Sequence, residues 1–119
     1  MQAQARGWRG AVVALVLGSS AALAHHGWSN YDADRAQTLK GTVQAVTWEM
    51  PHGHLTLQSG EARWNVVLAP PSRMEGRGLE RKALTVGKKV EVMGYPHRTE
   101  KGELRAERIT VDGKTVELR

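Results

Sequence analysis

The chain has 119 residues, with 17 Lys and Arg against 12 Asp and Glu and a formal net charge of +5. It contains no cysteine, which excludes disulfides, thiolate zinc sites and thiol redox chemistry. Its basic residues are scattered rather than gathered in a dense block, so the sequence gives little support to nucleic-acid binding.

Residues 1–24 have the three parts of a secretory signal peptide. Arg6 and Arg9 precede an apolar run at 10–18, and small residues then lead to Ala22-Leu23-Ala24, the A-x-A pattern of a cleavage site. The run is much shorter than the roughly 20 residues that span a bilayer. We therefore expect cleavage after Ala24 and a periplasmic or secreted protein without a stable membrane span. The alternatives are a cut after Ala22, an uncleaved anchor and an N-terminal core helix.

Cleavage after Ala24 would make His25 the first residue of the mature chain, followed by His26. A terminal histidine offers its α-amine and its imidazole to one metal ion, and copper(II) favours such tetragonal nitrogen sites. The pair therefore predicts a metal role. The alternative is that histidine is simply polar enough to follow a cleavage site. The leader carries two of the basic residues and no acidic one, which leaves +3 on the mature chain.

After the leader, residues 25–36 show no periodicity and are predicted to form an extended N-terminal arm. The domain proper is predicted at 37–119. Residues 37–49 alternate between apolar and polar side chains, which predicts a long half-buried strand. The apolar positions change parity after Ala45, which indicates a bulge or a sharp bend there.

Alternation predicts further strands, and Pro70-Pro71 ends the third of them. Ser72, with Glu75 three residues on, predicts a capped short helix. Asp112-Gly113 has the composition of a hairpin turn. Five principal strands with one short helix between the third and fourth follow the chain order of an OB-fold barrel, an all-β fold. An open SH3-like sheet is the alternative. The further strands are predicted at 54–58, 62–69, 89–95, 104–111 and 115–118.

Motifs spread along the mature chain give it a resemblance to a known family. The motifs are Ala24-His25-His26, Tyr31-Asp32, Leu39-Lys40-Gly41-Thr42-Val43, Trp48-Glu49-Met50-Pro51-His52, Pro71, Gly78-Leu79, Leu84, Gly87, Val90-Glu91-Val92-Met93-Gly94, Pro96 and Asp112-Gly113. In their order and spacing they resemble small exported bacterial proteins grouped as a domain of unknown function, family sixty-one fifty-two. Members usually carry Asn-Pro-His where this chain has Met50-Pro51-His52. The resemblance implies export and an OB-like fold, and it implies no established activity.

The remaining histidines fall at predicted loops. His52 and His54 flank Gly53 beside the connection between the first and second strands, and His97 lies between the fourth and fifth. These two connections border one binding face in OB folds, so we expect the three histidines to converge and the arm to bring His25 and His26 to them. Imidazoles suit copper, zinc and nickel, and the thioether of Met50 suits copper as a distant ligand. The alternative is loop histidines that hydrogen-bond locally.

These features predict a small exported protein that binds a transition metal, copper favoured, through His25, His26, His52, His54 and His97. The alternative is a metal-independent module that uses the barrel face, with Trp48 and Trp64, to bind an envelope protein or a glycan. Oligonucleotide binding is a third and weaker possibility for an OB fold, and export argues against it. No serine has a nucleophile context and no paired-carboxylate motif is present, so we do not expect an enzyme.

Overall fold

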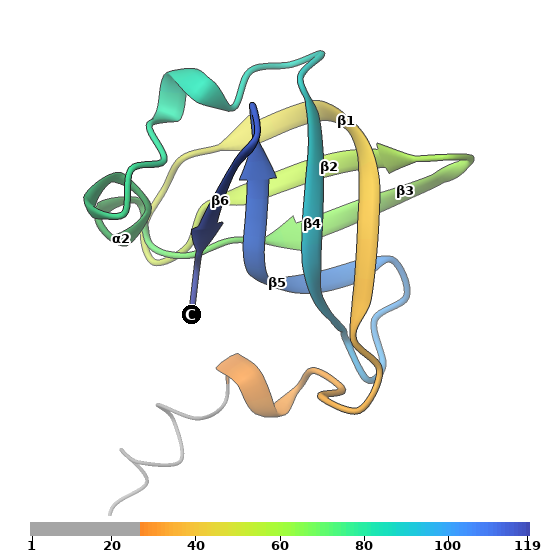
Figure 1. The fold of residues 1–119 in the computed structure, drawn as a ribbon. Coiled ribbons are helices and arrows are strands. Elements are labelled where there is room, and N and C mark those ends of the chain that lie inside the picture. The colour runs from red at the N-terminus through yellow and green to blue at the C-terminus, as the bar shows by residue number, and fades with distance from the viewer. Residues whose placement is uncertain (1–26) are drawn as a thin grey trace, which may run out of the picture.

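The computed structural model describes residues 27–119. The predicted signal peptide and the first two residues of the predicted arm precede this range and so lie outside the described residues. Figure 1 shows a small, strongly curved sheet with two short helical segments at one side. The elements in chain order are β1 (Gln37–Thr47), β2 (His54–Ser59), β3 (Ala62–Val67), α2 (Pro71–Gly76), the 3-10 turn η1 (Arg81–Ala83), β4 (Lys89–Pro96), β5 (Glu103–Val111) and β6 (Lys114–Glu117).

The sheet closes into a five-stranded barrel. β1 pairs antiparallel with both β2 and β4, β2 pairs with β3, and β4 pairs with β5. A short parallel pairing of β3 with β5, from Asn65 opposite Glu103 to Val67 opposite Arg105, closes the ring. β6 adds a sixth strand beside β5. This is the strand arrangement of an OB-like barrel, and it confirms the predicted fold class.

β1 serves two parts of the barrel because it changes partner midway. Its first half pairs with β4 as far as Thr42 opposite Lys89, and its second half pairs with β2 from Thr42 onward. The register with β2 shifts between Val43 and Ala45. The predicted irregularity is therefore present, one or two residues before the expected place, and it bends the strand around the barrel.

The segment between β3 and β4 contains the predicted short helix, but the predicted cap is wrong. Pro70 is the N-cap residue of α2, and no side chain caps the first turn. Glu75 instead accepts a hydrogen bond of 3.3 Å from Nε1 of Trp48, which ties α2 to the end of β1. Proline suits this start because the missing amide hydrogen would have had no partner in the helix.

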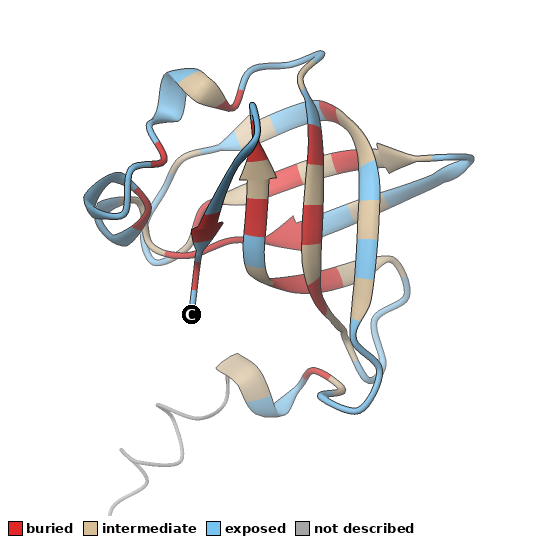
Figure 2. Cartoon of the chain, viewed as in Figure 1, coloured by how far each residue is buried: buried red, intermediate tan, exposed pale blue. Residues whose placement is uncertain are grey.

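The core fills the barrel and continues under α2. Figure 2 shows buried residues recurring along the strands, as alternation of inward and outward side chains requires. Leu57, Val92, Leu104 and Ile109 are completely buried strand residues, and Met74 of α2 closes one end of the core. Trp48 and Trp64 are half-buried and pack against this core.

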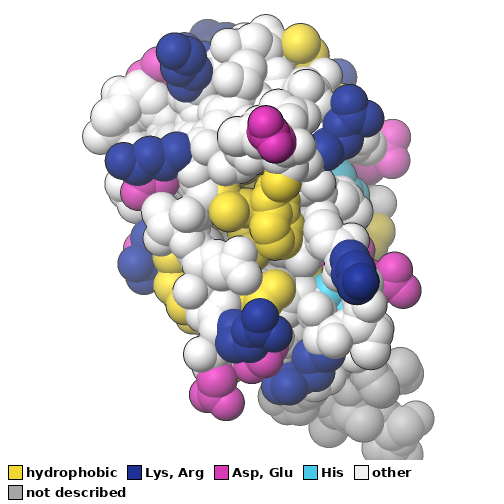
Figure 3. Space-filling model, turned by 90° about the vertical axis from the view of Figure 1, so that its right-hand side faces the viewer, with side chains coloured by type: hydrophobic (Ala, Val, Ile, Leu, Met, Phe, Trp, Pro, Cys, Tyr) yellow, Lys and Arg dark blue, Asp and Glu magenta, His cyan; other side chains and the backbone are white. Residues whose placement is uncertain are grey.

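The surface carries mixed charge. Figure 3 shows the face at the right of Figure 1, where apolar side chains gather in the middle and residues of both charge signs lie around them. On this face there is no continuous basic track of the kind that a nucleic acid backbone requires. Within residues 27–119, none of the helices has the length and apolar character needed to cross a membrane.

Candidate metal centre

The described part of the arm folds back onto one end of the barrel. Residues 27–29 are helical and Tyr31 forms an isolated bridge with His97, so this part of the arm is not extended throughout. The amide of Asp32 donates to the Pro96 carbonyl at 2.8 Å, and the amide of Arg98 donates to the Asn30 carbonyl at 2.8 Å. The arm therefore lies along the connection between β4 and β5.

The indole ring of Trp28 packs against two guanidinium groups and so holds the arm to the barrel. The guanidinium of Arg105 lies 4.5 Å from the centroid of the indole, and that of Arg119 lies 4.4 Å from it. Tyr95 of β4 adds an edge contact, with ring centroids 6.3 Å apart. Each cation–π contact of this kind contributes about 0.5–2 kcal/mol, depending on how far it is desolvated. The arm, β5 and the C-terminal residue are thus held together at one indole ring.

Tyr31 is the second anchor of the arm. Its ring is buried, its hydroxyl donates to Oε2 of Glu103 at 2.6 Å, and its edge meets the ring of His97 with centroids 5.1 Å apart. Burial, followed by the hydrogen bond to Glu103, raises the pKa of Tyr31 far above its ordinary value. The pKa of Tyr95 is also raised, first by its hydrogen bond to Glu107 and then by burial.

The two shifted tyrosines predict a loss of stability in alkali. Both raised values mean that the folded chain holds the phenol protons more tightly than the unfolded chain does. The stabilisation is complete below the ordinary tyrosine pKa of about 10 and is lost as the pH rises above it. These are the only two tyrosines in the sequence, so the absorbance of tyrosinate should rise at higher pH in the folded protein than after denaturation. Tyr31→Phe should reduce the alkaline loss, and superimposable titrations of folded and denatured protein would contradict this prediction.

Arg105 is a buried cation that joins the arm to β5. Its side chain is 8% exposed, and one of its terminal nitrogens donates to the Gly27 carbonyl at 3.1 Å. A Cβ atom on Gly27 would lie 2.9 Å from the same guanidinium, so a larger residue would require the end of the Arg105 side chain to shift. Burial lowers the pKa of Arg105 from its ordinary value. The sequence did not indicate this role, because Arg105 has the pattern of an ordinary strand residue.

His52 lies in the connection between β1 and β2, which is fixed against the end of β3. The Gly53 amide donates to the Ala69 carbonyl at 3.0 Å, and the Leu68 amide donates back to the Gly53 carbonyl at 2.8 Å. Nδ1 of His52 is buried and has no hydrogen-bond partner among residues 27–119. Burial, then the charges of Arg105, His54 and Arg73, lower the pKa of His52, and the backbone of Leu68 opposes this effect without cancelling it. Its imidazole is therefore neutral near pH 7, as a metal ligand must be.

Three of the five predicted ligand residues are described, and within residues 27–119 they do not form a group of three that could hold a metal ion. His52 and His54 are close enough to influence each other electrostatically. His97 is used locally: its Nδ1 accepts the amides of Thr99 and Glu100 at 3.1 and 2.9 Å, and its Nε2 lies 3.8 Å from Glu103. His25 and His26 lie outside the described residues.

The loops explain the separation of His97 from the other two histidines. Figure 1 shows the connection between β1 and β2 beside α2, and the connection between β4 and β5 at another side of the barrel. Residues 27–119 contain no group of three or more histidine, aspartate and glutamate side chains arranged to hold a metal ion. Met50 is 69% exposed, so its thioether is not packed into the barrel. A metal site that uses His52 and His54 would therefore need a ligand other than the histidine, aspartate and glutamate side chains of residues 27–119.

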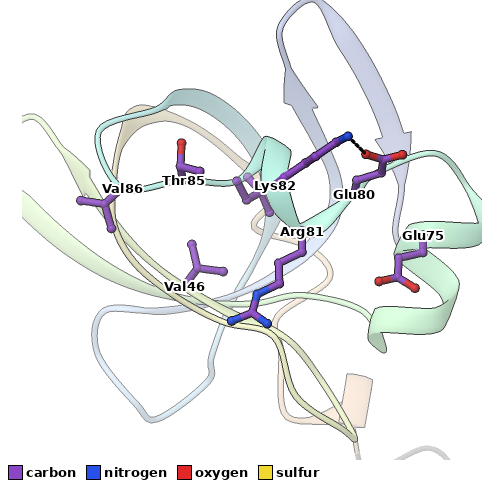
Figure 4. Close-up of a pocket in the computed structure, with 8 residues that line it drawn as sticks. Val46, Glu75, Glu80, Arg81, Lys82, Thr85 and Val86 are labelled. Carbon is purple, nitrogen blue, oxygen red and sulfur yellow. Dashed lines mark ion pairs between the residues drawn. The ribbon is translucent and has the colours of Figure 1, made fainter.

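A separate groove lies between β1, α2 and η1. It has a volume of about 810 Å³ and is lined by Val46, Glu75, Glu80, Arg81, Lys82, Leu84, Thr85 and Val86. Figure 4 shows the Arg81 side chain extending between Val46 and Glu75, while Lys82 pairs with Glu80 at 3.2 Å. None of the described histidines lines this groove, and its charges balance.

Comparison with known proteins assigns the chain to a family. The profile of a family of unknown function, DUF6152, matches residues 12–105, which is most of the sequence. The chain is a DUF6152 protein. The predicted resemblance is therefore confirmed. All five histidines and Arg105 of this DUF6152 protein lie inside the matched range, whereas β6 and Arg119 lie beyond it.

Solved structures support the fold of this DUF6152 protein and nothing more. One similar structure is the crystal structure of TiaS in complex with an isoleucine tRNA and ATP, with a TM-score of 0.50 and 20% sequence identity. The alignment covers 75% of this chain and 20% of that one. At this identity the likeness concerns the barrel alone. No curated protein matches the DUF6152 chain.

Proposed function

We propose that this DUF6152 protein is exported and that its mature form binds one transition-metal ion, with copper(II) favoured. The ligands in this proposal are the α-amine and imidazole of His25, together with His52 and with His26 or His54. His97 is left out because its Nδ1 accepts two amides of its own loop and its Nε2 faces Glu103 at the start of β5.

The observation that carries the proposal is the contact between Arg105 and Gly27. The Gly27 carbonyl accepts a hydrogen bond of 3.1 Å from the Arg105 guanidinium. The positive charge of the same guanidinium lowers the pKa of His52. His25 is two residues before Gly27, so its Cα lies at most about 7 Å from the Gly27 Cα. We therefore propose that His25 and His26 act at the end of the barrel that carries His52.

The chemistry of His52 supports the same site. A buried imidazole nitrogen without a partner among the described residues is costly, and coordination of a metal would satisfy it. The ring is already neutral near pH 7, so metal need not displace a proton from it. Copper(II) accepts tetragonal sets of amine and imidazole nitrogens and lies at the top of the divalent affinity order. The bound ion would supply Lewis-acid or one-electron chemistry, while the chain supplies the nitrogen ligands.

The test compares His52→Gln with His97→Gln in the mature chain. Removal of His52 should weaken copper(II) binding by about tenfold or more, because a ligand is lost. Removal of His97 should change the affinity less than about twofold, although it should lower stability by removing two loop hydrogen bonds. Competition titration gives the affinities, and native mass spectrometry gives the stoichiometry, which should be one ion per chain. Equal losses in the two variants, or no copper uptake by the unmodified mature chain, would reject this site.

A further inference from the structure

The register of the sheet leaves one edge of β1 unpaired. The hairpin between β2 and β3 closes on the pair Ser59 and Ala62. Hydrogen-bonded and non-hydrogen-bonded pairs alternate along an antiparallel ladder, so every second residue from Ser59 back along β2 directs its backbone groups toward β3. The Leu68 amide, which donates to the Gly53 carbonyl at 2.8 Å, continues this alternation. The remaining residues of β2 therefore direct their backbone groups toward β1.

Val46 has no backbone partner on this ladder. Thr56 and His54 are the β2 residues that face the second half of β1, and they lie opposite Ala45 and Thr47. Val46 stands between these two pairs, so its N–H and C=O point away from β2. β4 does not reach this part of β1, because their pairing ends before the bulge. A chain laid in extended form along this edge can therefore make both hydrogen bonds with Val46.

This edge borders the groove between β1, α2 and η1. Val46 and Val86 both line the groove, and Val86 is 70% exposed. The groove has a volume of about 810 Å³, which lies within the range of roughly 300–1,000 Å³ found for sites that bind ligands. The groove thus places a free strand edge beside an exposed apolar side chain.

The charged side chains that line the groove balance in number but not in pairing. Lys82 pairs with Glu80 at 3.2 Å, and Glu75 accepts the hydrogen bond of 3.3 Å from Trp48. The Arg81 side chain makes no hydrogen bond or ion pair with residues 27–119. Figure 4 shows this side chain extending between β1 and α2. A guanidinium in this position can hold a carboxylate through paired, charge-assisted hydrogen bonds.

The occupant that matches these features is a peptide rather than a nucleic acid. Glu75 and Glu80 line the same groove, so a row of phosphates would meet two carboxylates, whereas a single carboxylate can be placed on Arg81. We propose that the groove binds an extended segment of a partner protein, which pairs with Val46, packs an apolar side chain on Val86 and offers one carboxylate to Arg81. This site shares no residue with the proposed metal site.

Capped pentapeptides of valine and threonine that carry one aspartate, moved through each position in turn, test this inference. Amide NMR spectra of the mature chain are recorded with about 1 mM peptide and a metal chelator. At least one peptide should shift the amide signals of Val46, Thr85 and Val86. The Val46 amide should exchange rapidly with solvent in the free protein and more slowly in the complex, because it gains a hydrogen bond.

Arg81→Gln should weaken binding of that peptide about threefold to fivefold, and asparagine in place of the peptide's aspartate should have the same effect. Lys101→Gln is the matched control, since it removes an exposed positive charge in the connection between β4 and β5, outside the groove, and should change the affinity less than about twofold. A second aspartate in the peptide should also weaken binding. Absence of any shift at Val46 with every peptide, or equal affinity for the aspartate and asparagine peptides, overturns the proposal.

Discussion

Replacement of Gly41 by alanine is expected to lower the free energy of unfolding by about 3 kcal/mol. Gly41 lies in β1 just before the strand exchanges β4 for β2 as its partner. A Cβ atom there would collide with the Gln58 carbonyl oxygen and would lie 2.9 Å from Cγ of Leu57. The nearest atom belongs to the backbone of β2, which cannot rotate away as a flexible side chain can. The strands must separate, and the pairing that bends β1 around the barrel is weakened.

Gly76→Ala is the matched control for this variant. Gly76 ends α2, and nothing among the described residues lies within 4 Å of its hypothetical Cβ. Alanine there should be neutral or stabilising by about 0.5–1 kcal/mol, because it restricts the unfolded chain. Urea denaturation monitored by tryptophan fluorescence gives both values. A midpoint for Gly41→Ala equal to that of the parent protein would show that β1 and β2 do not approach as closely as described.

The strands were predictable because their pattern is local. β2, β4 and β5 begin and end within one residue of their predicted bounds, since alternation and the flanking turns are both visible in the sequence. The turn between β5 and β6 was predictable for the same reason. Asp112 and Gly113 both adopt positive φ, 51° and 77°, as a tight hairpin of twisted strands requires.

The predicted helix cap was wrong because α2 begins at Pro71, which places Ser72 inside the helix rather than before it. Ser72 and Glu75 have the spacing of a capping box, yet the Glu75 carboxylate accepts a hydrogen bond from Nε1 of Trp48 instead. A sequence pattern shows which local bond is available, but not which tertiary bond competes with it. The same limit applies to His97, whose Nδ1 is used by the amides of Thr99 and Glu100 in its own loop.

The buried arginine at the end of the barrel was also missed. Arg105 sits between Leu104 and Ala106 in β5, where three successive buried residues break the alternation. Its burial depends on Trp28 and Gly27, which are far away in the sequence and cover it only after the arm has docked. The sequence of the arm shows no periodicity, so its packing against the barrel could not be predicted from the sequence pattern. The histidines were identified as candidates by residue type, and among residues 27–119 they do not form a group that could hold a metal ion.

Blocking the α-amine of His25 by acetylation should lower copper(II) affinity on the order of 100-fold, close to 2.7 kcal/mol. The amine and imidazole of His25 bind as one chelate in the proposed site, and acetylation removes the amine while it leaves every side chain in place. The free amine has an ordinary pKa of roughly 7.7–8.0, so metal displaces only a weakly held proton near neutral pH. Chain extension by one residue is a poorer probe, because it would place His26 third, where the terminal amine, backbone amides and imidazole can bind copper by themselves.

The acetylated and free mature chains should have the same thermal stability without metal, which separates loss of a ligand from loss of the fold. Mass spectrometry of the exported protein supplies the second control. It should show that the mature chain begins at His25, since a chain that begins at Leu23 or elsewhere has no terminal histidine to chelate the ion. Equal copper affinity of the acetylated and free chains would remove the amine from the site. His52 would then have to bind metal with side chains alone, against the positive charge of Arg105.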